Sequence, residues 1–128
     1  LKALRISEQV RDARGEASAL DNLGVVHIRQ GNTVRAFQAL HRALHLTDSL
    51  HDKRLRSIVL NDLGIAYRTE KHFDSALVVY KQSLVLKEQL KDKQGSALTL
   101  NGIGIVFRLQ ERYDSALVFF TRALALQE

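Results

Sequence analysis

The hydrophobic pattern along this chain repeats at an interval of forty residues. Apolar stretches of the same shape surround glycines at positions 24, 64 and 104. In the middle stretch, Leu60, Leu63 and Tyr67 have the i, i+3, i+7 spacing of one buried helical face. A fixed period of about 20–50 residues is typical of proteins built from stacked repeats. The sequence therefore predicts that the chain consists of a helical unit written several times.

Each unit is expected to contain two helices. Asp12, Asp52 and Asp92 recur at the same interval, each just before a helical pattern, where a carboxylate can accept hydrogen bonds from the first turn. A first helix of roughly seventeen residues should follow each aspartate. After a break at Gly31-Asn32 and its counterparts, second helices should cover 33 to about 50, 73 to about 90, and 113 to the end.

The glycines inside the first helices predict close packing. A glycine in mid-helix costs about 1 kcal/mol relative to alanine. Its recurrence suggests that a neighbouring helix approaches closely at that point. In the second helices a small residue is followed four positions later by a large one, which suits two interlocking helices. These pairs are Ala36 with Leu40, Ala76 with Tyr80, and Ala116 with Phe120.

The opening residues resemble the second half of a unit. Residues 1–11 match 42–50 and 82–90, so we expect a second helix whose own first helix is missing. The units are then 12–51, 52–91 and 92–128. The chain has no methionine, which favours an excised fragment. The prediction is an all-α right-handed solenoid of about seven helices, one orphan helix followed by three pairs.

These units resemble the tetratricopeptide repeat. The resemblance is carried by Leu63-Gly64, an aromatic residue at Tyr67, a small residue at Ala76 and a large one at Tyr80. Two positions depart from it, because histidine stands at 27 and glycine at 102. The forty-residue period is similar to a longer class of the family, found in adaptors with Leu-Gly-Asn motifs and in sensor regions of bacterial signalling proteins. The resemblance implies a non-catalytic scaffold or sensor that binds proteins, with the first helix of each pair lining a concave surface.

A polar stripe on the first helices gives an independent indication of a binding surface. Polar residues at 21, 61 and 101 are followed four and seven positions later by residues on the same helical face. Asparagine can serve both backbone groups of a partner, and arginine can bind acidic side chains. The candidate peptide-binding residues are Asp21, Asn22, Val25, Ile28, Asn61, Asp62, Ile65, Arg68, Asn101, Ile105 and Arg108.

Three roles are open for this stripe. Its side chains could contact an extended or helical peptide, they could hydrogen-bond between repeats, or they could be solvated. We expect the first role, with a protein or peptide partner that is acidic, because the chain carries a net charge of +5. The partner itself is not indicated by the sequence.

Other functions receive less support. Basic residues near the boundaries between units could form an edge for nucleic acid, but a nucleic-acid groove would be expected to add exposed aromatic residues, so no nucleic acid is expected. The two ends lack capping repeats, which leaves self-association into a homodimer as an alternative. The basic residues are Arg11, Arg14, Lys53, Arg54, Arg56, Lys87, Lys91 and Lys93.

No catalytic or cofactor site is predicted. His41 and His45 lie one helical turn apart, but their counterparts in the other units are not metal ligands, and no third ligand has a suitable spacing. Gly102-Ile103-Gly104 lies inside a helical pattern with no strand before it, unlike a nucleotide-binding loop. Without cysteine, thiolate metal sites are excluded. No apolar run approaches the roughly 18 residues that span a membrane.

Overall fold

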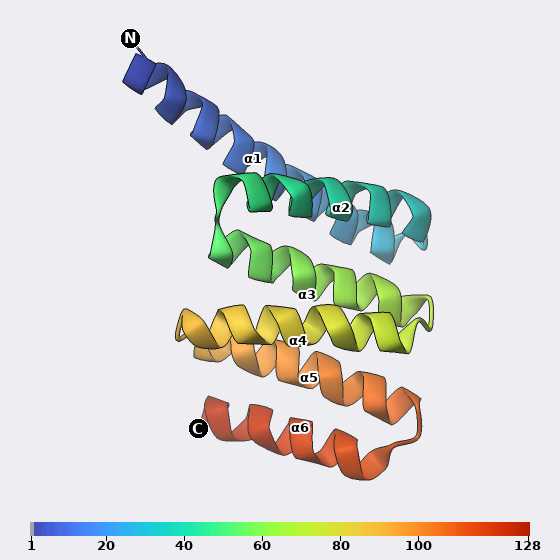
Figure 1. The fold of residues 1–128 in the computed structure, drawn as a ribbon. Helices are drawn as coiled ribbons and strands as arrows, with labels where there is room; N and C mark the ends of the chain where they lie inside the picture. The colour runs from blue at the N-terminus through green and yellow to red at the C-terminus, as the bar shows by residue number, and fades with distance from the viewer. Residues whose placement is uncertain (1) are drawn as a thin grey trace.

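The computed structural model describes the backbone of residues 2–128 and the side chains of residues 5, 6 and 8–128. In this part of the chain there are helices only, and they stack in sequence order as an all-α solenoid (Figure 1). The six helices are α1 (Lys2–Arg29), α2 (Thr33–Leu50), α3 (Lys53–Thr69), α4 (Phe73–Gln89), α5 (Lys93–Leu109) and α6 (Tyr113–Gln127).

The expectation of seven helices is wrong, because the orphan helix and the first helix of the first pair are one continuous helix. The later boundaries contain His51 and Lys91, whose backbones are left-handed with φ of 52° and 56°, but α1 runs straight through the equivalent position Arg11. The described side chains from Arg5 to Asp12 are all exposed, and this half of α1 projects beyond α2 (Figure 1). Since the described side chains here are exposed, the local helical hydrogen bonds determine the backbone.

The predicted capping aspartates act at two of their three positions. The side chain of Asp52 accepts a hydrogen bond from the Leu55 amide at 3.0 Å, and Asp92 accepts one from the Gly95 amide at 2.9 Å. Asp12 lies inside α1 and does not begin a helix. Asn32 caps α2 through the Arg35 amide, beside Gly31 with its φ of 78°.

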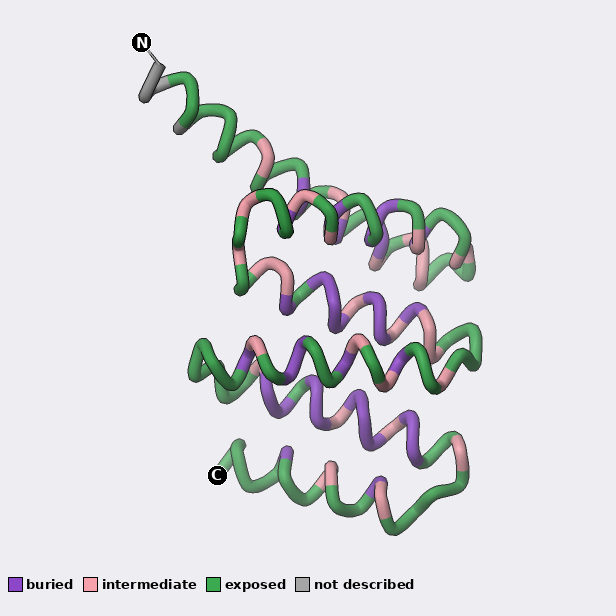
Figure 2. The backbone as a smooth tube through the Cα atoms, viewed as in Figure 1, coloured by how far each residue is buried: buried purple, intermediate pink, exposed green. Residues whose placement is uncertain are grey.

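The close approach predicted at the glycines is confirmed. A methyl group on Gly64 would lie 2.5 Å from the nearest ring carbon of Tyr80, and Gly24 and Gly104 are approached in the same way by Leu40 and Phe120. These contacts join the two helices of each pair. In the described part of the chain, α3 and α5 each carry more buried residues than any other helix, whereas α6 is largely exposed (Figure 2).

The helices form two layers of unequal spacing. The first helices contact one another in order, α1 with α3 and α3 with α5. Over the described residues, the second helices α2, α4 and α6 make no such contacts with one another. The layer of first helices is therefore on the inside of the curve, and we call its surface the concave face.

Candidate functional site

The predicted stripe lies on α1, α3 and α5 but differs in exposure along the stack. Asp21 and Asn61 are buried, with 6% and 5% of their surface exposed. Asn22 and Arg108 are exposed. The others are half-buried, namely Val25, Ile28, Asp62, Ile65, Arg68, Asn101 and Ile105.

Five of these residues line one hollow on the concave face, between α3 and α5. We call it the central cavity, and its volume is about 170 Å³. Of the described residues that line it, Arg68 alone is charged, and apolar and amide groups make up most of the wall. The lining residues are Asn61, Ile65, Arg68, Tyr80, Leu98, Asn101, Gly102 and Ile105. Arg108, Asp21 and the other predicted residues do not line it.

Asn61 is held by a buried hydrogen-bond chain that crosses three helices. The Lys87 ammonium on α4 donates to the Thr99 hydroxyl on α5 at 2.9 Å, and that hydroxyl donates to Oδ1 of Asn61 on α3, also at 2.9 Å. All three side chains are at least 95% buried. Asn61 therefore bonds between repeats, which was one of the three roles open for the stripe.

Asp21 and Asp62 form an acid pair where α1 meets α3. Burial and the neighbouring Asp21 carboxyl together raise the pKa of Asp62 to about 8, although Lys87 and Asn61 act in the opposite direction. Burial also raises the pKa of Asp21. One oxygen of Asp21, Oδ1, is buried without a hydrogen-bond partner among the described residues. Asp62 is therefore protonated at neutral pH, and the pair adds less than two full negative charges to the concave face.

Sequence reasoning missed three residues of the central cavity. Tyr80 belongs to a second helix and is predicted from sequence as a packing residue. Gly102 stands out in the sequence as a departure from the family pattern and as part of Gly102-Ile103-Gly104, and no sequence pattern singles out Leu98. Leu98 is 60% exposed on the cavity rim. The replacement of a polar residue by glycine at 102 was the one pattern that could have indicated an opening, because it removes a side chain from the face.

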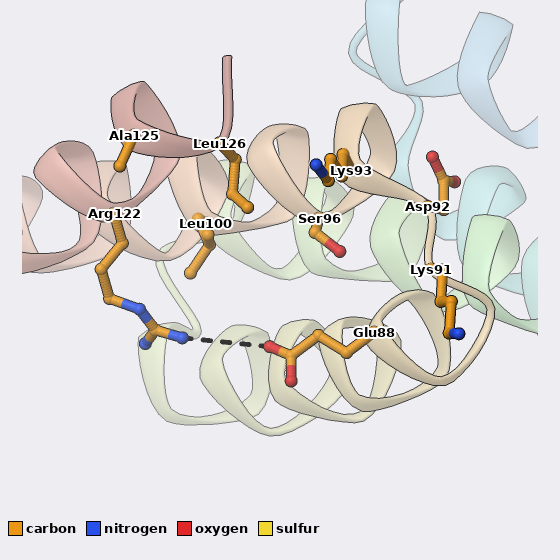
Figure 3. Close-up of a pocket in the computed structure, with 9 residues that line it drawn as sticks. All are labelled: Glu88, Lys91, Asp92, Lys93, Ser96, Leu100, Arg122, Ala125 and Leu126. Atoms are coloured by element: carbon orange, nitrogen blue, oxygen red, sulfur yellow. Dashed lines mark ion pairs between the residues drawn. The ribbon is translucent and has the colours of Figure 1, made fainter. Parts of the chain in front are cut away.

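A larger hollow of about 580 Å³ lies where α4 ends, α5 begins and α6 ends (Figure 3). Leu100 and Leu126 form apolar wall, and Arg122 reaches across toward Glu88, with 3.9 Å between Nη2 and Oε1. Ser96 faces this space. Its counterpart one unit earlier is Arg56, which forms an ion pair with Asp48. The hollow thus lies at a position where the preceding unit carries a longer side chain.

The basic residues near the unit boundaries do not act as one free edge. Lys87 is 3% exposed and belongs to the buried chain with Thr99. Arg14 forms an ion pair with Asp52 at 3.3 Å, and Arg56 is paired with Asp48. Exposed ion pairs of this kind contribute about 0–1 kcal/mol each.

No metal site is present among the residues whose side chains are described, because no three histidine, aspartate or glutamate groups lie together. His41 and His45 are both exposed, and His41 stacks on Phe37 with 6.1 Å between ring centroids. Across residues 2–128, no helix combines the length and apolar character that a membrane span requires.

Comparison with known families identifies the fold. The model of the tetratricopeptide repeat family matches residues 15–89, which is more than half of the chain. The chain belongs to the tetratricopeptide repeat family. Tetratricopeptide repeats are in general a scaffold for protein–protein interaction, so the scaffold part of the interpretation is supported.

Among solved structures, the crystal structure of BtubC (BKLC) from P. vanneervenii is similar. The two share 22% sequence identity with a TM-score of 0.81, over 98% of this chain and 52% of that one. This likeness concerns the fold alone, and the chain spans about half the length of that protein. A comparison with curated protein sequences finds no match.

Proposed function

We propose that this tetratricopeptide array is a non-catalytic module that holds an extended or helical peptide segment with acidic side chains on its concave face. The central cavity is the observation that carries the proposal. It gathers apolar surface from Ile65 and Ile105 beside the guanidinium of Arg68 and the amide of Asn101. A concave, mostly apolar site with a few polar groups is typical of ligand binding.

The charge of the face supports an acidic partner. Arg68 and Arg108 form no ion pair with any described residue, and the nearby carboxyls of Asp21 and Asp62 are paired with each other. Arginine side chains without an ion-pair partner favour binding of carboxylates through charge-assisted hydrogen bonds. The signalling context expected from the family resemblance stays a prediction.

A binding experiment tests this proposal. Fluorescein-labelled peptides of alternating glutamate and leucine are titrated with the protein, alongside counterparts in which glutamine replaces glutamate, and anisotropy is measured. Arg108→Ala should weaken binding of the glutamate peptide by about ten-fold, the usual effect of losing one charge-assisted hydrogen bond. Lys81→Ala removes the same charge from an exposed site on α4 and should change nothing. Failure of every peptide to bind, or equal losses in both variants, would refute the proposal.

Self-association is a second candidate function, favoured by the apolar surface of α6. Leu117 and Leu124 are 62% and 59% exposed, whereas their counterparts Leu77 and Leu84 pack in the core and Leu84 is only 8% exposed. A second copy could cover this surface with its own first helix. Light scattering over a dilution series should then show an average molar mass that decreases as the protein is diluted. A monomer at every concentration would exclude this function for the chain.

A further inference from the structure

Tyr80 is placed between two glycines on neighbouring first helices. The residue belongs to α4 and is 1% exposed. A methyl group on Gly64 of α3 would lie 2.5 Å from its ring, and one on Gly102 of α5 would lie 2.8 Å from it. Both distances are far shorter than carbon atoms allow. The two glycines therefore form a slot through which the ring passes between α3 and α5.

The slot brings the Tyr80 hydroxyl to the central cavity. Among the residues whose side chains are described, Tyr80 alone comes from a second helix to line this cavity. Nη1 of Arg68 donates a hydrogen bond to the Tyr80 hydroxyl oxygen at 3.3 Å. Since arginine is a donor only, the phenol oxygen is the acceptor, and its own hydrogen stays available. None of the described residues accepts that hydrogen.

A third donor faces the same space. Asn101 lines the cavity, is half-buried, and its side-chain amide hydrogen-bonds to no described residue. Asn61, by contrast, is engaged by Thr99. The cavity therefore presents a guanidinium, a phenol hydroxyl and an amide, with no described carboxylate on its wall. A ligand atom that only accepts hydrogen bonds matches this set of donors.

We propose that Arg68, Tyr80 and Asn101 form an oxyanion subsite that takes one carboxylate side chain of the bound segment. The inference rests on the proposed function and names the group that the concave face recognises at this point. A volume of about 170 Å³ accommodates a carboxylate with its methylene groups. Ile65, Ile105 and Leu98 surround those methylene groups with apolar surface, which strengthens the hydrogen bonds by excluding water.

The subsite occurs once in the stack, so it fixes the position of the segment. The counterparts of Tyr80 are Leu40 and Phe120, which fill the same place beside their glycines but carry no hydroxyl. The counterparts of Gly102 are Asn22 and Asp62, whose side chains would close the slot. A peptide with a single carboxylate therefore has one register in which that group meets all three donors.

Tyr80→Phe tests the subsite, because phenylalanine keeps the ring in the slot and removes only the hydroxyl. Binding of the glutamate–leucine peptide should weaken by about ten-fold, the loss typical of a hydrogen bond to a charged group, while binding of the glutamine peptide should stay the same. The matched control is Tyr67→Phe, the same change on α3 outside the cavity, which should alter neither affinity. Melting temperatures of both variants monitor folding. Equal effects of Tyr80→Phe on both peptides, or none, would overturn the subsite.

A small probe tests the subsite independently of any peptide sequence. N-acetylglutamate methylamide and its glutamine analogue are titrated while the Asn101 side-chain amide is followed by NMR. The glutamate probe alone should shift that resonance, and Tyr80→Phe should weaken the response. Identical responses to both probes would refute the subsite even if peptides bind elsewhere on the concave face. If no peptide binds but the glutamate probe gives the expected shift, the proposed function fails and the anion site stands. A phosphoserine peptide that binds more tightly, with the same dependence on Tyr80, would replace the carboxylate with a phosphoryl group.

Discussion

The two places where first helices meet use the same sequence positions for different chemistry. Between α3 and α5, Lys87, Thr99 and Asn61 form a continuous hydrogen-bond chain. Forty residues earlier the three positions hold Thr47, Val59 and Asp21. Val59 cannot donate, and Thr47 bonds to the Leu44 carbonyl of its own helix. Asp21 is thereby left without the partner that Asn61 has.

This difference in hydrogen-bond partners changes the protonation of the carboxyl groups at the α1–α3 junction. Asp21 lies against Asp62 instead. Burial together with the neighbouring Asp21 carboxyl keeps Asp62 protonated at neutral pH, and burial also raises the pKa of Asp21. The α3–α5 junction is held by neutral groups and one buried ammonium. The comparison teaches that a repeat position sets where a side chain lies, whereas its partners on other helices decide its charge state.

The largest expected effect is the pH dependence of the α1–α3 junction. Asp62 keeps its proton to about pH 8 when folded, but an unfolded aspartate loses it near 3.8. Between these values the folded chain binds more protons, so the free energy of unfolding falls as pH rises, by at most about 1.4 kcal/mol per pH unit for one proton. Asp62→Asn should flatten this fall in urea unfolding between pH 5 and 8.

Other titratable groups near Asp62 also affect the pH dependence of stability, so the measurement is confined to pH 5 to 8. Asp62 interacts with Asp21 on α1 and with Lys87 and Tyr80 on α4. Lys87 in turn interacts with Asp92. Burial lowers the pKa of Lys87, which raises stability with pH at more alkaline values. Asp74→Asn, at an exposed site, should keep the wild-type slope. An unchanged slope in Asp62→Asn would contradict the account of the pair.

The second effect concerns the α3–α5 junction. Asn61→Ala removes the acceptor of Thr99 inside a buried chain and should cost about 2–3 kcal/mol, because each unsatisfied buried polar group costs about 1–3 kcal/mol. Asn101→Ala, at the next unit, removes an amide without a described partner and should cost well under about 1 kcal/mol. Chemical denaturation measures both. Equal losses would mean that the chain through Thr99 does not stabilise the junction.

A third effect compares the helix starts. Asp52→Ala removes the cap of α3 and should cost about 1 kcal/mol. Asp12→Ala is the same change inside continuous α1 and should be close to neutral or slightly stabilising, since alanine favours helix. Thermal unfolding monitored by circular dichroism distinguishes them. A cost at Asp12 as large as that at Asp52 would indicate a helix boundary at Asp12 in solution.

The smallest effect is expected from a double substitution that gives the α1–α3 junction the side chains of the α3–α5 junction. Asp21→Asn with Val59→Thr places a hydroxyl and an amide where the α3–α5 junction has them. A double-mutant cycle should give a favourable coupling of about 0.5–1.5 kcal/mol, the value of one buried hydrogen bond. Additive single effects would show that equivalent positions in this stack do not share one geometry.

The sequence alone determined the repeating helix pair, because helical periodicity and end signals are local. The starts at Thr33, Phe73 and Tyr113 and the caps Asp52 and Asp92 follow from residues within a few positions of one another. The close packing at Gly64 follows from the recurrence of glycine every forty residues. The shared face of Asn61, Ile65 and Arg68 follows from the same periodicity.

Only the tertiary structure decided what those side chains do. Asn61 meets Thr99 across 38 positions of sequence, and Lys87 is buried where it meets α5. Tyr80 passes between α3 and α5 to reach the central cavity. The helix boundary expected at Asp12 is absent, because the described side chains around it are exposed and α1 continues through this position. Hydrogen bonding and burial depend on which atoms meet in space, and a one-dimensional period does not specify those atoms.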